Sequence, residues 1–146
     1  MKTTKNVLLG LVVILTLLIF FQACTKSTIT DIPEKYIIKE GETIHIPQNT
    51  KLGELTFLNY TDSRCPINAY CVWQGAALAN FKIKTDREEQ NIELCLGGCE
   101  VIKKNKKQKF VVNGVLYEAE LIELHPYPGL DKTTEIAQAT VLVQKK

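Results

Sequence analysis

The clearest indication of fold class is the segment Phe110-Val111-Val112-Asn113-Gly114-Val115-Leu116-Tyr117. An Asn-Gly pair between two arms rich in β-formers is the strongest short-range signal for a β-hairpin, because both residues tolerate the positive φ that a two-residue turn requires. The outgoing arm continues through Ala119 and Leu121. This segment therefore predicts two antiparallel strands.

Alternation of apolar and polar residues continues on both sides of this hairpin. Two windows have apolar residues at every second position, namely Ala77, Ala79, Phe81 and Ile83 in the first and Ala137, Ala139, Val141 and Val143 in the second. Shorter strand candidates are residues 35–39 and 42–46 around Glu40-Gly41, 53–60 and 91–96. After Cys24, no window of ten or more residues shows an apolar stripe of helical period. We expect an all-β domain, a small antiparallel β-sandwich of about eight or nine short strands, with a barrel as the alternative.

Large aromatic residues carried by these segments predict the core. They are Phe57, Trp73, Phe81, Phe110 and Tyr117. Aromatic side chains on strands usually fill the interior, because they bury more apolar area than other residues. An aromatic-lined binding groove is the alternative.

The N-terminal segment has the layout of a secretory signal. Residues 1–6 are basic, and residues 7–21 are apolar except for Gly10 and Thr16. The residues that follow, Phe21-Gln22-Ala23-Cys24, resemble the bacterial lipobox. That resemblance implies cleavage before Cys24 and a diacylglycerol thioether on its sulfur, and several acyl chains would hold the protein on a bilayer. An uncleaved anchor or plain secretion are the alternatives.

Cleavage before Cys24 would divide the chain into three predicted segments. Residues 1–23 are the predicted signal peptide, 24–33 a lipidated tether, and 34–146 a single β-sandwich domain. Thr25 stands where an aspartate would retain a lipoprotein in the inner membrane, so the resemblance implies the outer membrane of a Gram-negative bacterium. The tether lacks an acidic run, which favours an orientation facing the periplasm.

The net charge gives no indication of a nucleic-acid partner. The 146 residues carry 18 basic and 16 acidic side chains. Lys2 and Lys5 lie in residues 1–23, which hold no acidic residue, so the remainder has 16 of each sign. A neutral domain produces no long-range field that would attract nucleic acid, and the predicted membrane attachment is through the lipid on Cys24.

Four cysteines remain after Cys24, and an even number in an exported chain points to disulfides. We expect Cys65–Cys71 and Cys95–Cys99, because residues 66–70 can form a compact loop and Gly97-Gly98 permits a tight reversal. A crossed Cys71–Cys95 disulfide stays open as an alternative. By chain entropy it would stabilise the fold by about 3.5 kcal/mol, against about 2 kcal/mol for each local disulfide. A metal site is the weaker alternative, because neither cysteine spacing is that of a zinc knuckle. A redox-active pair would normally use a Cys-x-x-Cys motif, which is absent.

The segment Asp62-Ser63-Arg64-Cys65-Pro66 continues to Cys71-Val72-Trp73-Gln74-Gly75. It resembles a motif of small, uncharacterised bacterial lipoproteins, and the later His125-Pro126-Tyr127-Pro128 is similar to a Pro-Tyr-Pro of that group. The resemblance implies a small β-domain with a bonded Cys65–Cys71 loop and no assigned activity.

Residues Asp62, Arg64, Tyr70 and Trp73 form a possible recognition loop, with a structural corner as the alternative. Asp62 suits an Asx turn, and Gly75 suits a close approach of two backbones. Arg64 is expected either to pair with Asp62 or to stack on Trp73.

Five lysines lie within seven residues: Lys103, Lys104, Lys106, Lys107 and Lys109. They could bind an anionic lipid or glycan. The favoured interpretation is a solvated loop that protects a sheet edge, since lysine is frequent there. Glu118, Glu120 and Glu123 are close enough in sequence to offset them.

No catalytic motif is present, and we expect neither metal nor cofactor. His45 and His125 have no motif around them that would form a hydrolase or metallopeptidase site. We expect a non-enzymatic, lipid-anchored module that binds an envelope protein or glycan. The alternatives are an inhibitor or immunity-type lipoprotein presenting the Cys65–Cys71 loop, and an envelope hydrolase with a site made of scattered residues.

Overall fold

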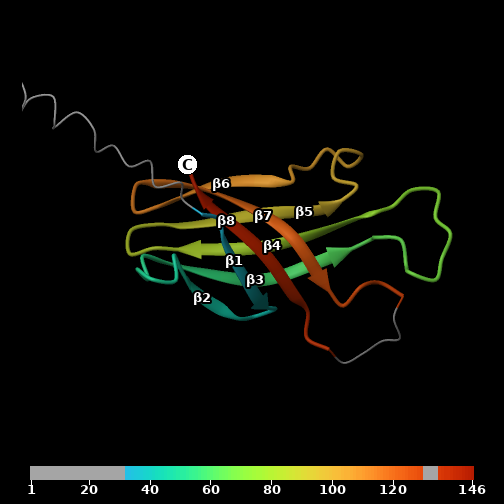
Figure 1. Ribbon diagram of the computed structural model, residues 1–146, viewed down its shortest axis with the longest axis horizontal. Helices are drawn as coiled ribbons and strands as arrows, with labels where there is room; N and C mark the ends of the chain where they lie inside the picture. The colour runs from blue at the N-terminus through green and yellow to red at the C-terminus, as the bar shows by residue number, and fades with distance from the viewer. Residues whose placement is uncertain (1–31, 130–134) are drawn as a thin grey trace, which may run out of the picture. The chain divides into compact units, whose positions relative to one another are not determined.

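In the computed structural model, residues 32–129 and 135–146 are described. Their eight strands are β1 (Glu34–Lys39), β2 (Thr43–Ile46), β3 (Gly53–Asp62), β4 (Ala76–Lys84), β5 (Glu89–Gly97), β6 (Lys107–Val112), β7 (Val115–His125) and β8 (Gln138–Lys145). They form two four-stranded antiparallel sheets, in the orders β1-β8-β7-β6 and β2-β3-β4-β5 (Figure 1). The all-β, sandwich-like fold is thereby confirmed. The predicted signal peptide and lipidated Cys24 lie outside the described residues.

The predicted hairpin is the β6–β7 connection. Val112 pairs with Val115, so the turn consists of Asn113 and Gly114 alone. Their φ values of 48° and 81° are both positive, as a turn that matches the twist of the flanking strands requires. The two aromatic residues of the arms, Phe110 and Tyr117, stack with ring centroids 5.7 Å apart.

The alternating residues of β4 and β8 form the core, as expected. Ala77, Ala79, Phe81 and Ile83 are fully buried, and so are Ala139 and Val141. Phe81 stacks on Phe57 of the neighbouring strand, with ring centroids 5.0 Å apart. Two aromatic assignments differ from expectation. Tyr36 is 1% exposed and belongs to the core, whereas Trp73 is 43% exposed and does not.

The strands around Glu40-Gly41 are present but lie in different sheets. β1 pairs with β8, and β2 pairs with β3. Gly41 crosses between the sheets with a φ of 81°, and its N–H donates to the carbonyl of Phe57 at 2.7 Å. This connection therefore joins the two layers.

The edge strands β5 and β6 are joined by one side chain. Gln90 Nε2 donates to the carbonyl of Val111 at 2.7 Å, and Val111 N donates to Gln90 Oε1 at 3.4 Å. The Gln90 side chain thus makes the hydrogen bonds to Val111 that a neighbouring strand would otherwise make. Fewer backbone groups at the edge of β6 therefore remain free to pair with another chain.

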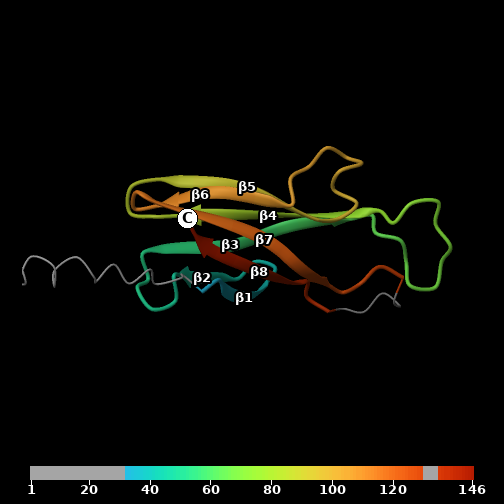
Figure 2. The ribbon, with the colours of Figure 1, turned by 45° about the horizontal axis from the view of Figure 1, so that its top comes forward.

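The domain has two different ends (Figures 1 and 2). We call the first the stapled end; it consists of the β3–β4 and β5–β6 connections, residues 63–75 and 98–106, and the described parts of the β7–β8 connection, residues 126–129 and 135–137. We call the second the hairpin end; it consists of the β2–β3, β4–β5 and β6–β7 turns together with the start of β1 and the end of β8. The first described residue, Ile32, lies at the hairpin end, where it lines a pocket with residues of β1 and β8.

Candidate functional site

Both local disulfides are present, and each lies in a connection of the stapled end. The Cys65–Cys71 and Cys95–Cys99 pairs have Cα–Cα distances of 5.9 and 5.8 Å. The first closes the β3–β4 connection, and the second joins the end of β5 to the loop that follows. The crossed pairing is therefore excluded.

Arg64 fixes the base of the β3–β4 connection. Its guanidinium is 8% exposed and donates from Nε and Nη2 to both carboxylate oxygens of Asp62, at 2.6–3.0 Å. Nη2 also donates to the carbonyl of Leu124 at 2.8 Å. The aromatic face that it contacts is Tyr127, with the ring centroid 4.3 Å from Cζ. Arg64 thus connects the β3–β4 connection to the β7–β8 connection.

The two alternatives for Arg64 are resolved by these contacts. The Asp62 pairing is confirmed, and stacking on Trp73 was wrong, because Tyr127 occupies that role. The Asx turn is also present, since Arg64 N donates to Asp62 Oδ1 at 3.0 Å. Asp62 and Arg64 are therefore buried structural residues and do not themselves offer a surface to a partner.

Other predicted recognition residues are exposed. Tyr70 is fully exposed, and so is Val72, which the sequence interpretation missed. Ile67, which lies within the Cys65–Cys71 loop, is 66% exposed. From Cys65 to Phe81 the sequence has no Asp, Glu, Lys, Arg or His, and this run was the available signal for an exposed apolar loop. We call residues 65–73 the stapled loop.

Trp73 links the stapled loop to the β5–β6 connection. A Cβ on Gly98 would lie 3.2 Å from its Cζ3, so the indole packs directly on the Gly98 backbone. Gly98 N donates to the carbonyl of Gly75 at 2.8 Å. A Cβ on Gly75 would lie 1.9 Å from the carbonyl oxygen of Ser63, which confirms the expected close approach of two backbones.

The Cys95–Cys99 disulfide belongs to a second, smaller core. Ala76, Cys95 and Cys99 are buried together, with Leu78 and Ile102 packed against them. This cluster lies beneath the β5–β6 connection, on which Trp73 rests. The second disulfide therefore supports the surface that carries the stapled loop.

The lysine cluster is divided between a loop and a strand. Lys107 and Lys109 belong to edge strand β6, while the other three precede it. Glutamates pair with three of the five: Lys104 with Glu93 at 2.6 Å, Lys106 with Glu100 at 3.5 Å, and Lys107 with Glu120 at 3.1 Å and Glu118 at 3.9 Å. Local carboxylates thus offset much of the positive charge. Anion binding by this cluster stays a prediction.

His125 ends β7 on an open surface. Its Nε2 lies 2.8 Å from Oε1 of Glu123, and about half of each side chain is exposed. This contact lowers the pKa of the Glu123 carboxyl. Among the described residues, no group of three His, Cys, Asp or Glu side chains is placed to hold a metal ion. The same part of the chain has no helix long and apolar enough to span a bilayer.

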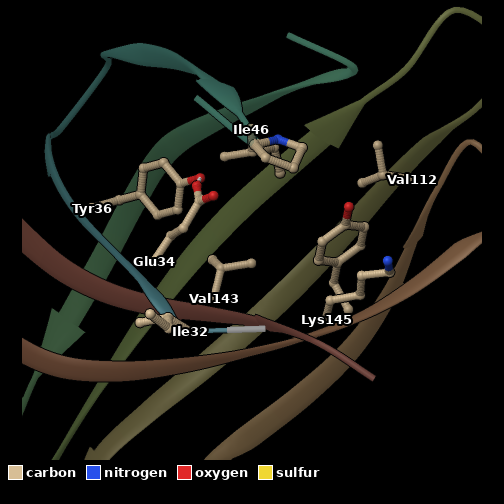
Figure 3. A pocket seen from close by; sticks show the side chains of 9 residues that line it. Ile32, Glu34, Tyr36, Ile46, Val112, Val143 and Lys145 are labelled. Atoms are coloured by element: carbon tan, nitrogen blue, oxygen red, sulfur yellow. Dashed lines mark hydrogen bonds between the residues drawn. The ribbon is translucent and has the colours of Figure 1, made fainter. Parts of the chain in front are cut away.

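A pocket of about 210 Å³ opens at the hairpin end (Figure 3). Its walls include Ile46, Val112 and Val143, and its polar groups include Glu34 and Tyr36. The Tyr36 hydroxyl donates to Glu34, and Gln48 N donates to the same carboxylate oxygen at 3.4 Å. The Glu34 carboxylate therefore already accepts hydrogen bonds from the β2–β3 turn and from the Tyr36 phenol. For this reason the pocket is a weaker candidate for a ligand site than the stapled loop.

No protein-family model matches the chain, and comparisons with curated proteins and with solved structures find no match either. The stapled loop therefore has to be interpreted from its own chemistry.

Proposed function

We propose that this chain is a non-enzymatic, lipid-anchored binding module of the Gram-negative outer membrane, and that it docks on an envelope protein through the stapled loop. The observation that carries the proposal is the full exposure of Tyr70 and Val72 on a loop closed by a disulfide. Folding alone gives no reason to display two apolar side chains on so constrained a segment. Contiguous exposed apolar groups mark interaction sites on other proteins, and two such side chains close together on a restrained loop support one here.

Energetics support a protein partner. Burying one large apolar side chain contributes about 1.5–3 kcal/mol, and interface residues that dominate binding are enriched in tyrosine and tryptophan. Holding a flexible side chain or loop at an interface costs about 0.5–1.5 kcal/mol per ordered side chain. The disulfide and the buried Arg64 contacts order this loop before binding, so less of that cost falls on association.

The position of the loop supports a partner that projects from the membrane. Ile32 lines the pocket at the hairpin end. The β3–β4 connection, which contains the stapled loop, lies at the other end of the domain (Figure 1). Eight residue steps separate Cys24 from Ile32 and span at most about 28 Å. With a lipid on Cys24, the tether would enter the domain at its hairpin end, the end opposite the stapled loop.

Enzymatic activity is the less supported alternative. A general base needs a partner and a site that excludes water. His125 has the Glu123 carboxylate beside it, but the pair lies at an open strand end and does not line the pocket at the hairpin end. The hydrolase hypothesis stays a prediction that no contact of His125 supports.

Affinity capture of the tagged, full-length lipoprotein from its native envelope tests the proposal, when three forms are compared quantitatively. Tyr70→Asp places a charge on the stapled loop. Leu52→Asp is the matched control, because Leu52 is also an exposed loop residue and lies at the hairpin end. We expect one envelope protein to be captured by the wild type and Leu52→Asp and lost with Tyr70→Asp. Equal capture by all three forms would contradict the proposal.

Lipidation needs its own test. Intact mass of the mature protein should show acyl chains on Cys24, and Cys24→Ser should abolish them. An uncleaved or unmodified N-terminus would contradict the anchor.

A further inference from the structure

We propose that the Cys65–Cys71 disulfide is a thiol–disulfide exchange site, which a dithiol of the cell envelope reduces while Cys95–Cys99 stays intact. Reduction would release the stapled loop and so weaken docking. This second step rests on the proposed docking function and adds its regulation. The pair lacks the Cys-x-x-Cys spacing of an oxidoreductase, so it serves as a substrate of exchange and not as its catalyst.

The two disulfides differ in their access to solvent. Cys95 and Cys99 are 1% and 0% exposed, and they belong to the smaller core beneath the β5–β6 connection. In the other pair, Cys71 is exposed and Cys65 is partly buried. Exchange requires a thiolate to reach a sulfur atom, so the buried bond reacts only after local unfolding has uncovered it. A reductant of the folded protein therefore meets Cys65–Cys71 first.

The surroundings of the two sulfur atoms indicate which one is attacked. The carbonyl oxygens of Ala69 and Pro66 lie 3.5 and 3.7 Å from Cys65 Sγ. Their partial negative charge repels a thiolate that approaches Cys65, and after reduction they can accept a hydrogen bond from the Cys65 thiol. Residues 65–81 of the sequence carry no carboxylate that would repel a thiolate at Cys71. We therefore place the attack on Cys71 Sγ.

The reaction moves two electrons and two protons from the dithiol to the disulfide. The first thiolate of the dithiol bonds to Cys71 Sγ, the S–S bond breaks, and Cys65 leaves as a thiolate that takes up a proton. The second thiolate of the dithiol then attacks its own partner sulfur in the mixed disulfide and releases Cys71 as a thiolate, which is also protonated. The dithiol leaves as a disulfide, so the reaction needs no other reactant.

Contacts next to the disulfide would hold the rest of the stapled end in place after reduction. Cys65 N donates to the carbonyl of Gln74 at 2.9 Å, so the two chain segments stay paired at the base of the loop. Trp73 packs on Gly98 beyond the bridged segment. That segment lies entirely between β3 and β4. Reduction therefore frees residues 66–72 without opening either sheet.

The freed segment carries the proposed docking residues. Tyr70 lies between the two cysteines, and Val72 directly follows the second. With the bond intact, these side chains are presented on an ordered loop. Once it is broken, a partner would have to order them on binding, at a cost in conformational entropy. The reduced form should therefore dock more weakly than the oxidised form.

Graded reduction of the full-length lipoprotein in detergent micelles tests the exchange site. The protein is treated with dithiothreitol, free thiols are blocked with N-ethylmaleimide at intervals, and peptide mass mapping gives the reduced fraction of each disulfide. We expect Cys65–Cys71 to be reduced at least about 100-fold faster than Cys95–Cys99, because the buried bond requires local unfolding. Glutathione, used in place of dithiothreitol and quenched with acid, should add to Cys71 and not to Cys65. Hydrogen exchange should become faster in residues 66–72 and stay unchanged in β4.

Capture from the native envelope tests the effect on docking. Wild type is reduced with dithiothreitol and desalted without oxygen before it meets the envelope extract. We expect the reduced wild type and Cys65→Ser/Cys71→Ser to capture about 10-fold less partner than oxidised wild type, as two side chains must then be ordered on binding. Reoxidation should restore capture by wild type only.

Equal reduction rates for the two disulfides would overturn the exchange site. Unfolding of the whole domain together with loss of Cys65–Cys71 would also overturn it, because the release would not be local. Full capture by reduced wild type would overturn the effect on docking and leave the proposed docking function in place. If oxidised wild type captures no partner, the docking function is wrong and its regulation with it, while the two reduction rates still decide the exchange site.

Discussion

The two ends of this domain close their strands in different ways. At the hairpin end, Asn113-Gly114 makes a two-residue turn, and Thr85 caps the β4–β5 turn by accepting from Glu88 N at 3.1 Å. At the stapled end, two disulfides, a buried ion pair and three close glycine contacts hold longer connections together. The extra restraints surround the segment that exposes Tyr70 and Val72. This difference between the two ends is the basis of the proposed docking function of the stapled loop.

Removing the Arg64 guanidinium should break the stapled end most severely. Arg64→Ala leaves the Asp62 carboxylate buried without its partner, and we expect a loss of about 3–5 kcal/mol in the free energy of unfolding. Arg64→Lys should recover only part of it, because an ammonium cannot make the two-pronged contact with Asp62 and also reach Leu124. Urea unfolding measures both. A loss under 1 kcal/mol for Arg64→Ala would show that the Arg64 contacts do not hold this end together.

Two glycine substitutions compare the ends directly. Gly75→Ala must move backbone, because its Cβ would lie 1.9 Å from Ser63 O, and φ is +72° there; we expect a cost of about 3–4 kcal/mol. In Gly114→Ala the new Cβ would have no heavy atom within 4 Å. Only the positive φ then lowers the free energy of unfolding, by about 1 kcal/mol. Thermal unfolding of the two variants checks the order. Equal costs would remove the distinction between a packed and an open turn.

The two disulfides should separate stability from docking. Cys65→Ser/Cys71→Ser and Cys95→Ser/Cys99→Ser should each cost about 2 kcal/mol, because each bond closes a short loop. Capture of the envelope partner should fall sharply only for the first pair, which orders Tyr70 and Val72. Denaturant unfolding and quantitative capture measure the two effects. Loss of capture with the second pair alone would move the docking surface to the β5–β6 connection.

The smallest expected effect lies at the hairpin end. Burial, followed by the hydrogen bond to Glu34 and the charge of its carboxylate, raises the pKa of Tyr36 above its ordinary range. A phenol whose folded pKa is raised stabilises the fold fully below its unfolded pKa of about 10, and this contribution is lost as the pH rises further. The free energy of unfolding should therefore fall above about pH 10 in the wild type and less steeply in Tyr36→Phe. Parallel pH profiles would contradict this.

Much of the fold was predictable because strand patterning is local. Alternation in residues 77–83 and 137–143 identified the inward face of β4 and β8, and Asn113-Gly114 identified the hairpin. Sheet membership was not predictable in the same way. Lys39 pairs with Gln138, and β2 pairs with β3, so adjacent strands in sequence separate into two layers by contacts that no local pattern records.

The candidate site was predictable in part. Short spacing and Gly97-Gly98 indicated both disulfides. Tyr70, a predicted recognition residue, is exposed, and its contact with a partner stays a prediction. Trp73 was wrong as a core residue, because aromatic size does not show that a residue rests on the backbone of another loop. The Arg64–Tyr127 contact joins residues 63 positions apart and leaves no local signal.

Site-specific photo-crosslinking in the native envelope tests the central claim most directly. A photoreactive phenylalanine replaces Tyr70 at the stapled end or Leu52 at the hairpin end of the full-length lipoprotein. The account predicts that position 70 forms a crosslink to one envelope protein and that position 52 does not. Crosslinks of equal yield from both positions, or a crosslink from position 52 alone, would contradict the assignment of the stapled loop as the docking site.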